Sequence, residues 1–286
     1  MVSNYLILFS SGRESFLVLE KMLSLFNGSN RRVRIHLVHI NYGQASFAGE
    51  SAAMFEYLHE WFILRRSERD LSRVKDGRLM TDEYFLKDEE GQPIDTVSVV
   101  VSEPVVTVPT VPTAILKGES GNDLVPYRNA MFVLFALNYI EGLPEDYRVD
   151  RLVLTNTAEA GNGDSFSKIV HPMYEVVRLS RKDERLLTYV APLVDSNTIN
   201  EELANHIVTE HPYLTKYIVS CDKGVRPGCG VCTKCQMNIS MSAEQIKSME
   251  AMLPHGISPE EYNEEEQTLV ESIQKLKTFL AQVYGK

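Results

Sequence analysis

The chain has 286 residues and a formal net charge of −10, with 44% hydrophobic and 24% charged residues. These values are ordinary for a globular protein with a substantial core, and they exclude a dedicated nucleic-acid binder as the first interpretation. The first apolar run, from Tyr5 to Phe9, is too short for a signal peptide or a membrane span. We therefore expect a cytoplasmic protein without a membrane or direct nucleic-acid partner.

The chain opens with a predicted strand at Tyr5 to Phe9, a turn of small and polar residues from Ser10 to Ser15, and a helix from Phe16 to Phe26. A strand, turn and helix in this order direct free backbone N–H groups and the positive end of a helix dipole at an anion. Gly12 allows a phosphate to approach the backbone closely. The alternative is a plain strand-to-helix connection in which serines cap the helix.

A second strand at 34–41 and a helix at about 50–62 repeat this order, so the first sixty residues predict the start of a doubly wound parallel sheet. His36 and His39, near the end of that strand, are interpreted as packing residues. Residues 65–110 predict an inserted excursion whose basic and acidic runs form solvated faces, with a substrate or partner surface as the alternative. Within it, β-branched stretches at 96–101 and 105–108 indicate strands, with a hairpin as one arrangement.

Further along, Arg128 and Asn129 stand at the mouth of a helix at 130–140 that is apolar nearly all round. Either Arg128 places a positive charge where a polyanion binds, or Asn129 caps the helix and Arg128 lies on the surface. A buried strand at 151–155 runs into a polar, glycine-rich stretch that contains Asp164 and Phe166, where this architecture keeps its substrate.

After a strand-like piece at 190–194, the remainder is expected to be mainly helical, with segments at 200–209, 243–252 and from Pro259 onward. The last helix carries an apolar stripe at alternating spacings of four and three residues: Leu269, Ile273, Leu276, Leu280 and Val283. Such a stripe packs on its own domain or forms the seam of a homodimer or protein complex.

All four cysteines fall within fifteen residues, with the spacing C-x7-C-x2-C-x2-C. Thiolates hold Zn²⁺ in closed tetrahedral sites, and the glycines between them permit the necessary turns. Unrelated buried thiols or a pair of disulfides are the alternatives, which the tight clustering and the expected reducing compartment disfavour. The pattern predicts a structural zinc site, without an open position for a reacting water, formed by Cys221, Cys229, Cys232 and Cys235.

Four separated pieces of the chain resemble the 7-cyano-7-deazaguanine synthases, the QueC family of the N-type ATP pyrophosphatases. They are Leu8 to Ser15, Asn41 to Gln44, Val125 to Asn129 and the cysteine cluster, in the family's order over about residues 5 to 240. The resemblance implies an HUP-type (adenine nucleotide alpha hydrolase-like) α/β fold. It also implies conversion of 7-carboxy-7-deazaguanine through an amide to a nitrile, with ammonia as nitrogen donor and ATP with Mg²⁺ as cosubstrate.

The resemblance also assigns roles by position. Binding of the ATP phosphates falls to the turn residues Ser10, Ser11, Gly12, Arg13 and Ser15. Catalytic roles fall to Arg128, Asn129 and Glu14. The residues assigned to the deazaguanine substrate are Tyr42, Gln44, Asp164 and Phe166. We expect domains at 1–200, the ATP-pyrophosphatase-like α/β domain, and at 201–286, a zinc-binding and mainly helical lobe.

The chain departs from the family pattern at several positions. The family's loop reads Ser-Gly-Gly-x-Asp-Ser, whereas here Ser11 adds a side chain and Glu14 is one methylene longer than aspartate. A lysine after the Pro192-Leu193 strand is missing, and Ser165 stands where a further cysteine is usual. Three functions therefore remain open: a ligase that uses ammonia, a QueC-like enzyme of phage defence or DNA modification that uses another amine, and a nucleotide-binding interaction module without catalysis.

Overall fold

The computed structural model describes residues 2–27, 29–65, 80–103, 106–107, 128–143, 145–153, 212–221, 223–226, 228–254, 258–259 and 262–284. Backbone contacts divide the chain into two compact units. The sheet unit comprises Met1–Ser10, Glu14–Gln44 and Met54–Asp195, and the cysteine unit comprises Ser11–Arg13, Ala45–Ala53 and Ser196–Lys286.

The sheet unit is built on a six-stranded sheet with the order β4-β5-β6-β2-β1-β8. Strands β6, β2, β1 and β8 are mutually parallel, and β5 pairs antiparallel with both β4 and β6. A separate parallel pair joins two short strands, β3 and β7. The strand bounds are β1 Val2–Leu8, β2 Arg32–Val38, β3 Ile40–Asn41, β4 Phe62–Arg65, β5 Met80–Lys87, β6 Pro93–Glu103, β7 Val106–Thr107 and β8 Arg151–Val153. This mixed α/β architecture, dominated by parallel strands, agrees with the predicted fold class.

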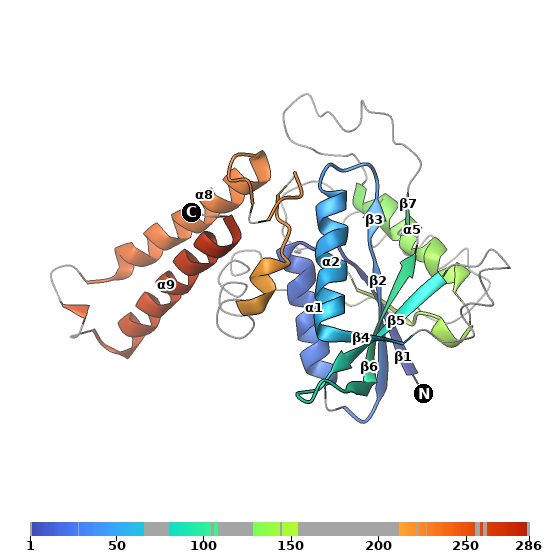
Figure 1. Ribbon diagram of the computed structural model, residues 1–286. Helices are drawn as coiled ribbons and strands as arrows, with labels where there is room; N and C mark the ends of the chain where they lie inside the picture. The colour runs from blue at the N-terminus through green and yellow to red at the C-terminus, as the bar shows by residue number, and fades with distance from the viewer. Residues whose placement is uncertain are drawn as a thin grey trace. The chain divides into compact units, whose positions relative to one another are not determined.

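Helices cover both faces of the sheet (Figure 1). Successive side chains of a strand point to opposite faces, and β1 illustrates the result. The ring of Tyr5 lies 5.2 Å from that of Phe26 at the end of α1 (Arg13–Phe26), whereas Leu6 belongs to a buried cluster with Ala136 and Ile140 of α5 (Arg128–Gly142). Helix α2 (Phe47–Trp61) lies beside α1, on the face opposite α5. Strands buried on both faces explain the continuous apolar runs in the sequence.

The predicted hairpin of strands 96–101 and 105–108 is wrong. Strand β6 pairs with β2 and β5 inside the main sheet, and β7 pairs with β3 instead. Residues 80–103, within the predicted excursion, thus form β5 and β6 of the sheet. Periodicity indicated the strands but could not identify their partners, because a β-branched run suits either neighbour. Glu83, expected on a solvated face, is also buried.

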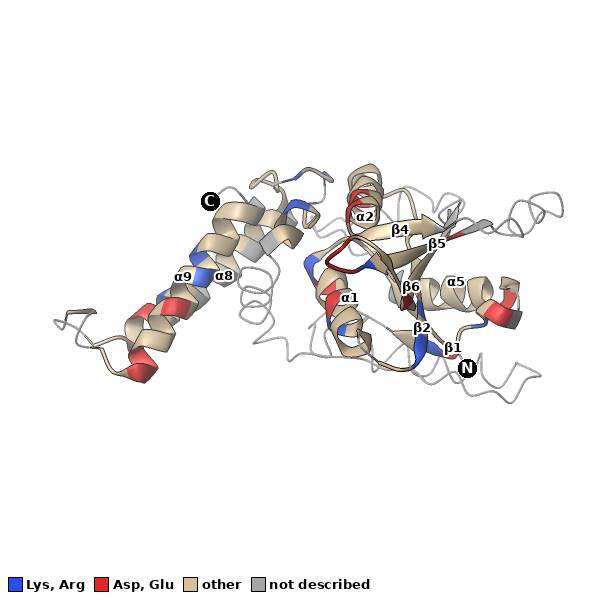
Figure 2. Cartoon of the chain, turned by 60° about the horizontal axis from the view of Figure 1, so that its bottom comes forward, with Lys and Arg blue, Asp and Glu red and all other residues tan. Residues whose placement is uncertain are grey.

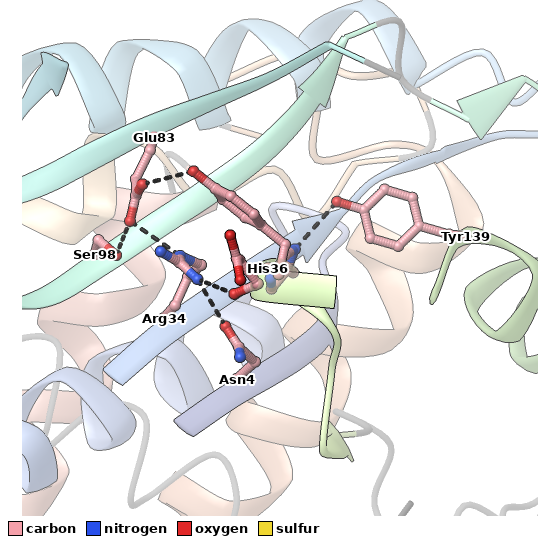
Figure 3. A network of polar contacts seen from close by, with 8 residues as sticks. Asn4, Arg34, His36, Glu83, Ser98 and Tyr139 are labelled. Atoms are coloured by element: carbon pink, nitrogen blue, oxygen red, sulfur yellow. Dashed lines mark hydrogen bonds and ion pairs between the residues drawn. The ribbon is translucent and has the colours of Figure 1, made fainter. Parts of the chain in front are cut away.

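Glu83 belongs to a buried polar network between the sheet and the segment after α5 (Figure 3). Its carboxylate accepts hydrogen bonds from Arg34 Nε at 3.0 Å, Ser98 Oγ at 2.6 Å and the Tyr147 hydroxyl at 3.2 Å. The Arg34 guanidinium also donates to Asn4 Oδ1 at 3.2 Å. A buried ion pair needs such additional bonds to offset the cost of desolvating two charges.

His36 lies beside this network and is fully buried. Its Nδ1 lies 3.2 Å from the Tyr139 hydroxyl, and its Nε2 has no hydrogen-bond partner among the described residues. Burial, helped by the positive charge of Arg34, lowers the pKa of His36 to about 3. The ring is therefore neutral in the folded protein at neutral pH. His36 and His39 are both core residues, as the sequence indicated.

The cysteine unit contains a 3-10 turn, η4 (Pro212–Lys216), and two long helices, α8 (Thr233–Met252) and α9 (Glu264–Tyr284). The helix predicted at 243–252 thus begins at Thr233, and the last helix begins after Pro259 because Asn263 caps it. Asn263 Oδ1 accepts from Glu266 N at 2.9 Å, while Asn263 N donates to Glu266 Oε2 at 2.8 Å, a capping box. The acidic first turn of α9 is visible in Figure 2.

The apolar stripe of α9 packs within this unit. Ile273, Leu276 and Leu280 are buried, as is Phe279, and α9 contacts both α8 and η4. The middle of the stripe thus packs inside the protein, as one of the two sequence interpretations expected, while Leu269 is half-buried. None of the helices in the described part of the chain is both long enough and apolar enough to span a membrane.

Candidate functional site

The topology of the sheet determines where a ligand is expected. The chain passes from β1 to β2 on one side and later places β8 on the other, so the strand order reverses at β1. In open α/β sheets, ligands bind outside the carboxyl ends of the strands at such a point. The turn from Ser10 to Arg13 follows the carboxyl end of β1 directly and leads into α1. The predicted phosphate-binding turn therefore follows the strand at which the order reverses.

Ser11 determines the shape of this turn. It has a left-handed backbone, with φ of 53°, and is completely buried. Its hydroxyl donates to the Glu50 carbonyl oxygen at 2.7 Å, and its own carbonyl accepts from Val219 N at 2.8 Å. Left-handed geometry is rare for a residue with a side chain, so these bonds stabilise an unfavourable conformation. The hydroxyl proton of Ser11 is directed into the protein.

The other turn residues flank Ser11 in sequence. Ser10 is exposed and Ser15 buried, with their hydroxyl oxygens 3.5 Å apart. Arg13 is buried and Glu14 is half-buried in the first turn of α1. The structure thus brings the hydroxyls of Ser10 and Ser15 together at the start of this helix. Their role toward phosphate, and that of Gly12, stays a prediction.

The Asn41–Gln44 piece is a tight turn closed by its own side chains. Asn41 Oδ1 accepts from Gly43 N, and Gln44 Oε1 accepts from Tyr42 N, both at 3.0 Å. The Gln44 amide also donates to the Ile40 carbonyl at 3.0 Å. Gly43, with φ of 88°, supplies the left-handed position that the turn requires. Gln44 therefore stabilises the turn, and its contact with substrate stays a prediction.

The Tyr42 side chain is positioned differently from that of Gln44. It is half-buried, and its ring lies 5.4 Å from the ring of Phe132 on α5. Arg128 and Asn129 form the first turn of the same helix, but their side chains lie outside the described part of the structure. Asp164 and Phe166 lie outside the described residues altogether. The catalytic and substrate roles assigned to these residues stay predictions.

The four cysteines converge as the sequence predicted. Their Sγ atoms all lie within 4.8 Å of one another, and those of Cys221 and Cys232 are 3.9 Å apart. A tetrahedral zinc with Zn–S bonds of about 2.3 Å requires sulfur atoms roughly 3.8 Å apart. None of the four is in a disulfide. The cluster therefore fits a metal ion such as zinc and provides four thiolates for it.

Backbone N–H groups around the cluster favour thiolates. Cys232 N donates to Cys229 Sγ at 3.3 Å, and Cys235 N donates to Cys232 Sγ at 3.5 Å at the start of α8. Hydrogen bonds from the backbone of Val231 and Cys232 lower the pKa of Cys229 to about 6. Burial raises the pKa of Cys235, whose thiol must lose its proton when a metal binds.

Residues that the sequence analysis did not single out join the turn and the cysteine loop inside the cysteine unit. The backbones of Gly49 and Gly224 touch so closely that a Cβ on Gly49 would overlap the Gly224 carbonyl. A Cβ on Gly224, which has φ of +67°, would lie 2.8 Å from the Ser46 carbonyl oxygen. Ser46 Oγ donates to Glu50 Oε1 at 2.8 Å, beside the carbonyl that Ser11 contacts. The sequence indicated Gly224 only as one of the turn-forming glycines of the cysteine loop, and it gave no sign of the approach to Ser46 and Gly49.

A family model described as "Queuosine biosynthesis protein QueC" matches residues 4–244. The chain belongs to the QueC family. QueC proteins are ATP-using enzymes of the C–N ligase type that make a queuosine precursor, and the match includes both the Ser10–Ser15 turn and all four cysteines. Helix α9 lies beyond the matched residues. No curated protein matches the chain in a sequence search.

Proposed function

We propose that this QueC-family protein uses ATP to activate a carboxylate of the 7-carboxy-7-deazaguanine type and joins it to ammonia. The observation that carries the proposal is the turn after β1, where a buried left-handed Ser11 precedes the first turn of α1 at the point where the strand order reverses. Free N–H groups at the start of a helix suit a phosphate or pyrophosphate group. Membership of the QueC family supports the choice of ATP.

The chemistry begins with adenylation. A carboxylate oxygen attacks the α-phosphorus of ATP, the bond to pyrophosphate breaks, and the acyl adenylate forms. Ammonia then attacks the acyl carbon, a proton is lost, and AMP leaves to give the amide. For the nitrile, the amide oxygen attacks the α-phosphorus of a second ATP and pyrophosphate leaves. The carbon–oxygen bond then breaks to release AMP, and loss of the two amide protons gives the nitrile.

In this proposal, the Ser10–Ser15 turn holds the departing pyrophosphate through backbone N–H groups and the hydroxyls of Ser10 and Ser15. Donors already in position stabilise the developing negative charge without reorganisation during the reaction. Mg²⁺, bound with ATP, would neutralise part of the phosphate charge. Arg128, at the first turn of α5, would supply a positive charge near the phosphates, and a metal ion on the four cysteines would hold its loop in shape without taking part in the reaction.

The proposal is tested by mass spectrometry of a reaction that contains the purified protein, ATP, Mg²⁺, 7-carboxy-7-deazaguanine and ammonium. Formation of AMP with an amide or nitrile product would support it. Ser15→Ala and Arg128→Ala should lower turnover while the fold persists. Ser24→Ala, on the exposed face of the same helix as Ser15, is the matched control and should leave turnover unchanged. Unchanged ATP consumption in both site variants would refute the assignment of these residues.

A second candidate keeps the activation step and changes the acceptor to another amine, including one on a protein, as in phage defence or DNA modification. Helix α9, beyond the family match, and the altered turn sequence favour such a specialised branch. AMP formation with a deazaguanine adduct on protein, and without free nitrile, would favour this candidate. Absence of any nucleotide turnover would favour an interaction module instead.

A further inference from the structure

The loop that carries Cys221 contacts Ser11 of the predicted phosphate-binding turn, and this loop and Ser11–Arg13 both belong to the cysteine unit. Val219, two residues before the ligand, donates its N–H to the carbonyl of Ser11 at 2.8 Å. Gly224, three residues after it, packs backbone to backbone against Ser46 and Gly49 at the start of α2. A predicted metal ligand thus lies between two contacts, one with Ser11 in the turn and one with the start of α2.

Ser11 joins these contacts together. Its carbonyl is held by Val219, and its hydroxyl is held by the carbonyl of Glu50, one residue from Gly49. Both bonds are buried, and they fix the peptide groups of a residue whose φ of 53° is unfavourable without them. The conformation of the turn therefore depends on the positions of Val219 and, through the start of α2, of Gly224.

A bound metal would restrict those residues. Gly224 N donates to the Cys221 carbonyl at 2.8 Å, so the tight turn that presents Gly224 to α2 begins at the ligand itself. A metal joined to Cys221 and to Cys229, Cys232 and Cys235 would fix this turn from both ends. When the ligands lose the metal, the same backbone regains the freedom to move.

We infer that metal binding at the four cysteines sets the conformation of the Ser11 turn, so that metal and nucleotide affinities are coupled. The part of this inference that concerns nucleotide binding rests on the proposed function. Coupling between two sites is reciprocal, so ATP should tighten metal binding by the same factor by which metal tightens ATP binding. We expect a factor on the order of tenfold, within the usual range for coupled sites.

The test uses the full-length, metal-loaded protein. Zinc affinity is measured by competition with a chromophoric chelator, with and without ATP and Mg²⁺, and ATP binding is measured by calorimetry. In the wild type we expect ATP to raise zinc affinity on the order of tenfold. Gly49→Ala, which forces the two backbones apart, should abolish this increase. Gly142→Ala, where a Cβ meets nothing within 4 Å, is the matched control and should retain it.

Ser11→Ala provides a milder variant that removes the hydroxyl bond to Glu50 and leaves the cysteine loop untouched. It should bind zinc as the wild type does and bind ATP more weakly. If both variants keep the full coupling, or if ATP binds the wild type without changing its zinc affinity, the inference is overturned.

Hydrogen exchange separates this inference from the proposed function. Chelation of the metal should raise exchange at the amides of Val219 and the Ser10–Ser15 turn relative to α5, with no nucleotide present. If exchange responds in this way but ATP does not bind, the proposed function fails and the link between the metal and the turn stands. If ATP binds and the exchange rate at the turn is the same with and without the metal, the inference fails and the proposed function stands.

Discussion

The buried ring of His36 should make the sheet unit unstable in acid, and the change His36→Asn should remove much of this effect. His36 has a folded-state pKa of about 3 against an ordinary value of 6.5, mainly because the ring is fully buried. The unfolded chain binds the proton more readily, so protonation favours unfolding. The stability that the neutral ring contributes is complete above pH 6.5 and is lost as the pH falls toward 3.

The magnitude follows from the two pKa values. Each unit of pH below 6.5 lowers the free energy of unfolding by about 1.4 kcal/mol until the folded-state pKa is reached. At pH 5 the loss attributable to His36 is therefore about 2 kcal/mol. The charged group that acts on the ring is Arg34, and the rings of Tyr139 and Tyr147 lie 6.0 and 6.3 Å from that of His36. The positive charge of Arg34 disfavours a second positive charge on the ring, so it lowers the pKa of His36, as burial does.

The assay is urea unfolding between pH 5 and pH 8, for the wild type and for His36→Asn. Asparagine keeps a polar group near the position of Nδ1, so Tyr139 retains a partner, and it does not titrate. We expect the variant to be less stable at pH 8 and to lose about 2 kcal/mol less than the wild type on going to pH 5. His59→Asn, at an exposed position of α2, is the control. Parallel curves for the wild type and His36→Asn would refute the reasoning.

The remaining predictions concern the buried polar network of Arg34 and Glu83, the four-cysteine metal centre and the packing of α9. Glu83→Gln leaves the buried Arg34 without its counter-charge and should cost roughly 3–5 kcal/mol in urea unfolding, whereas Glu90→Gln, at an exposed turn, should cost under about 0.5 kcal/mol. Cys232→Ser should lose zinc by elemental analysis and destabilise the cysteine unit; full zinc content would contradict the four-thiolate centre. Leu276→Ala should lower the free energy of unfolding by about 2–5 kcal/mol in the same urea assay, because Leu276 is fully buried, and an unchanged midpoint would refute the packing of α9.

Local pattern predicted much of the fold. The apolar run at Tyr5, the turn after it and the amphipathic helix identified β1 and α1, since each signal lies within a few residues. The cysteine spacing likewise predicted a cluster that the structure confirms. Strand pairing could not be predicted in this way, because β6 lies beside β2 as a result of contacts far apart in the sequence. The acidic run around Glu83 was assigned to solvent for the same reason, since its partner Arg34 is 49 residues away.

The candidate site was predictable only where a motif carried it. The turn from Ser10 to Ser15 was indicated by its small and polar residues, and the piece from Asn41 to Gln44 by the resemblance to the family. The contact of Gly224 with Ser46 and Gly49 was not indicated, because it joins segments far apart in the sequence. The sequence showed Ser11 as an added side chain, but it could not show where that side chain points. Close approach of two backbones leaves no sign in either segment alone.

The serine at position 11, where the family pattern has glycine, is accommodated by hydrogen bonds on two sides. A left-handed residue with a side chain costs roughly 1–2 kcal/mol relative to glycine. A buried hydrogen bond such as that from Ser11 Oγ to the Glu50 carbonyl offsets about 1 kcal/mol of this cost. The bond from Val219 holds the same residue from its carbonyl side. These two buried partners explain how the turn keeps a left-handed conformation at position 11 with a residue that carries a side chain.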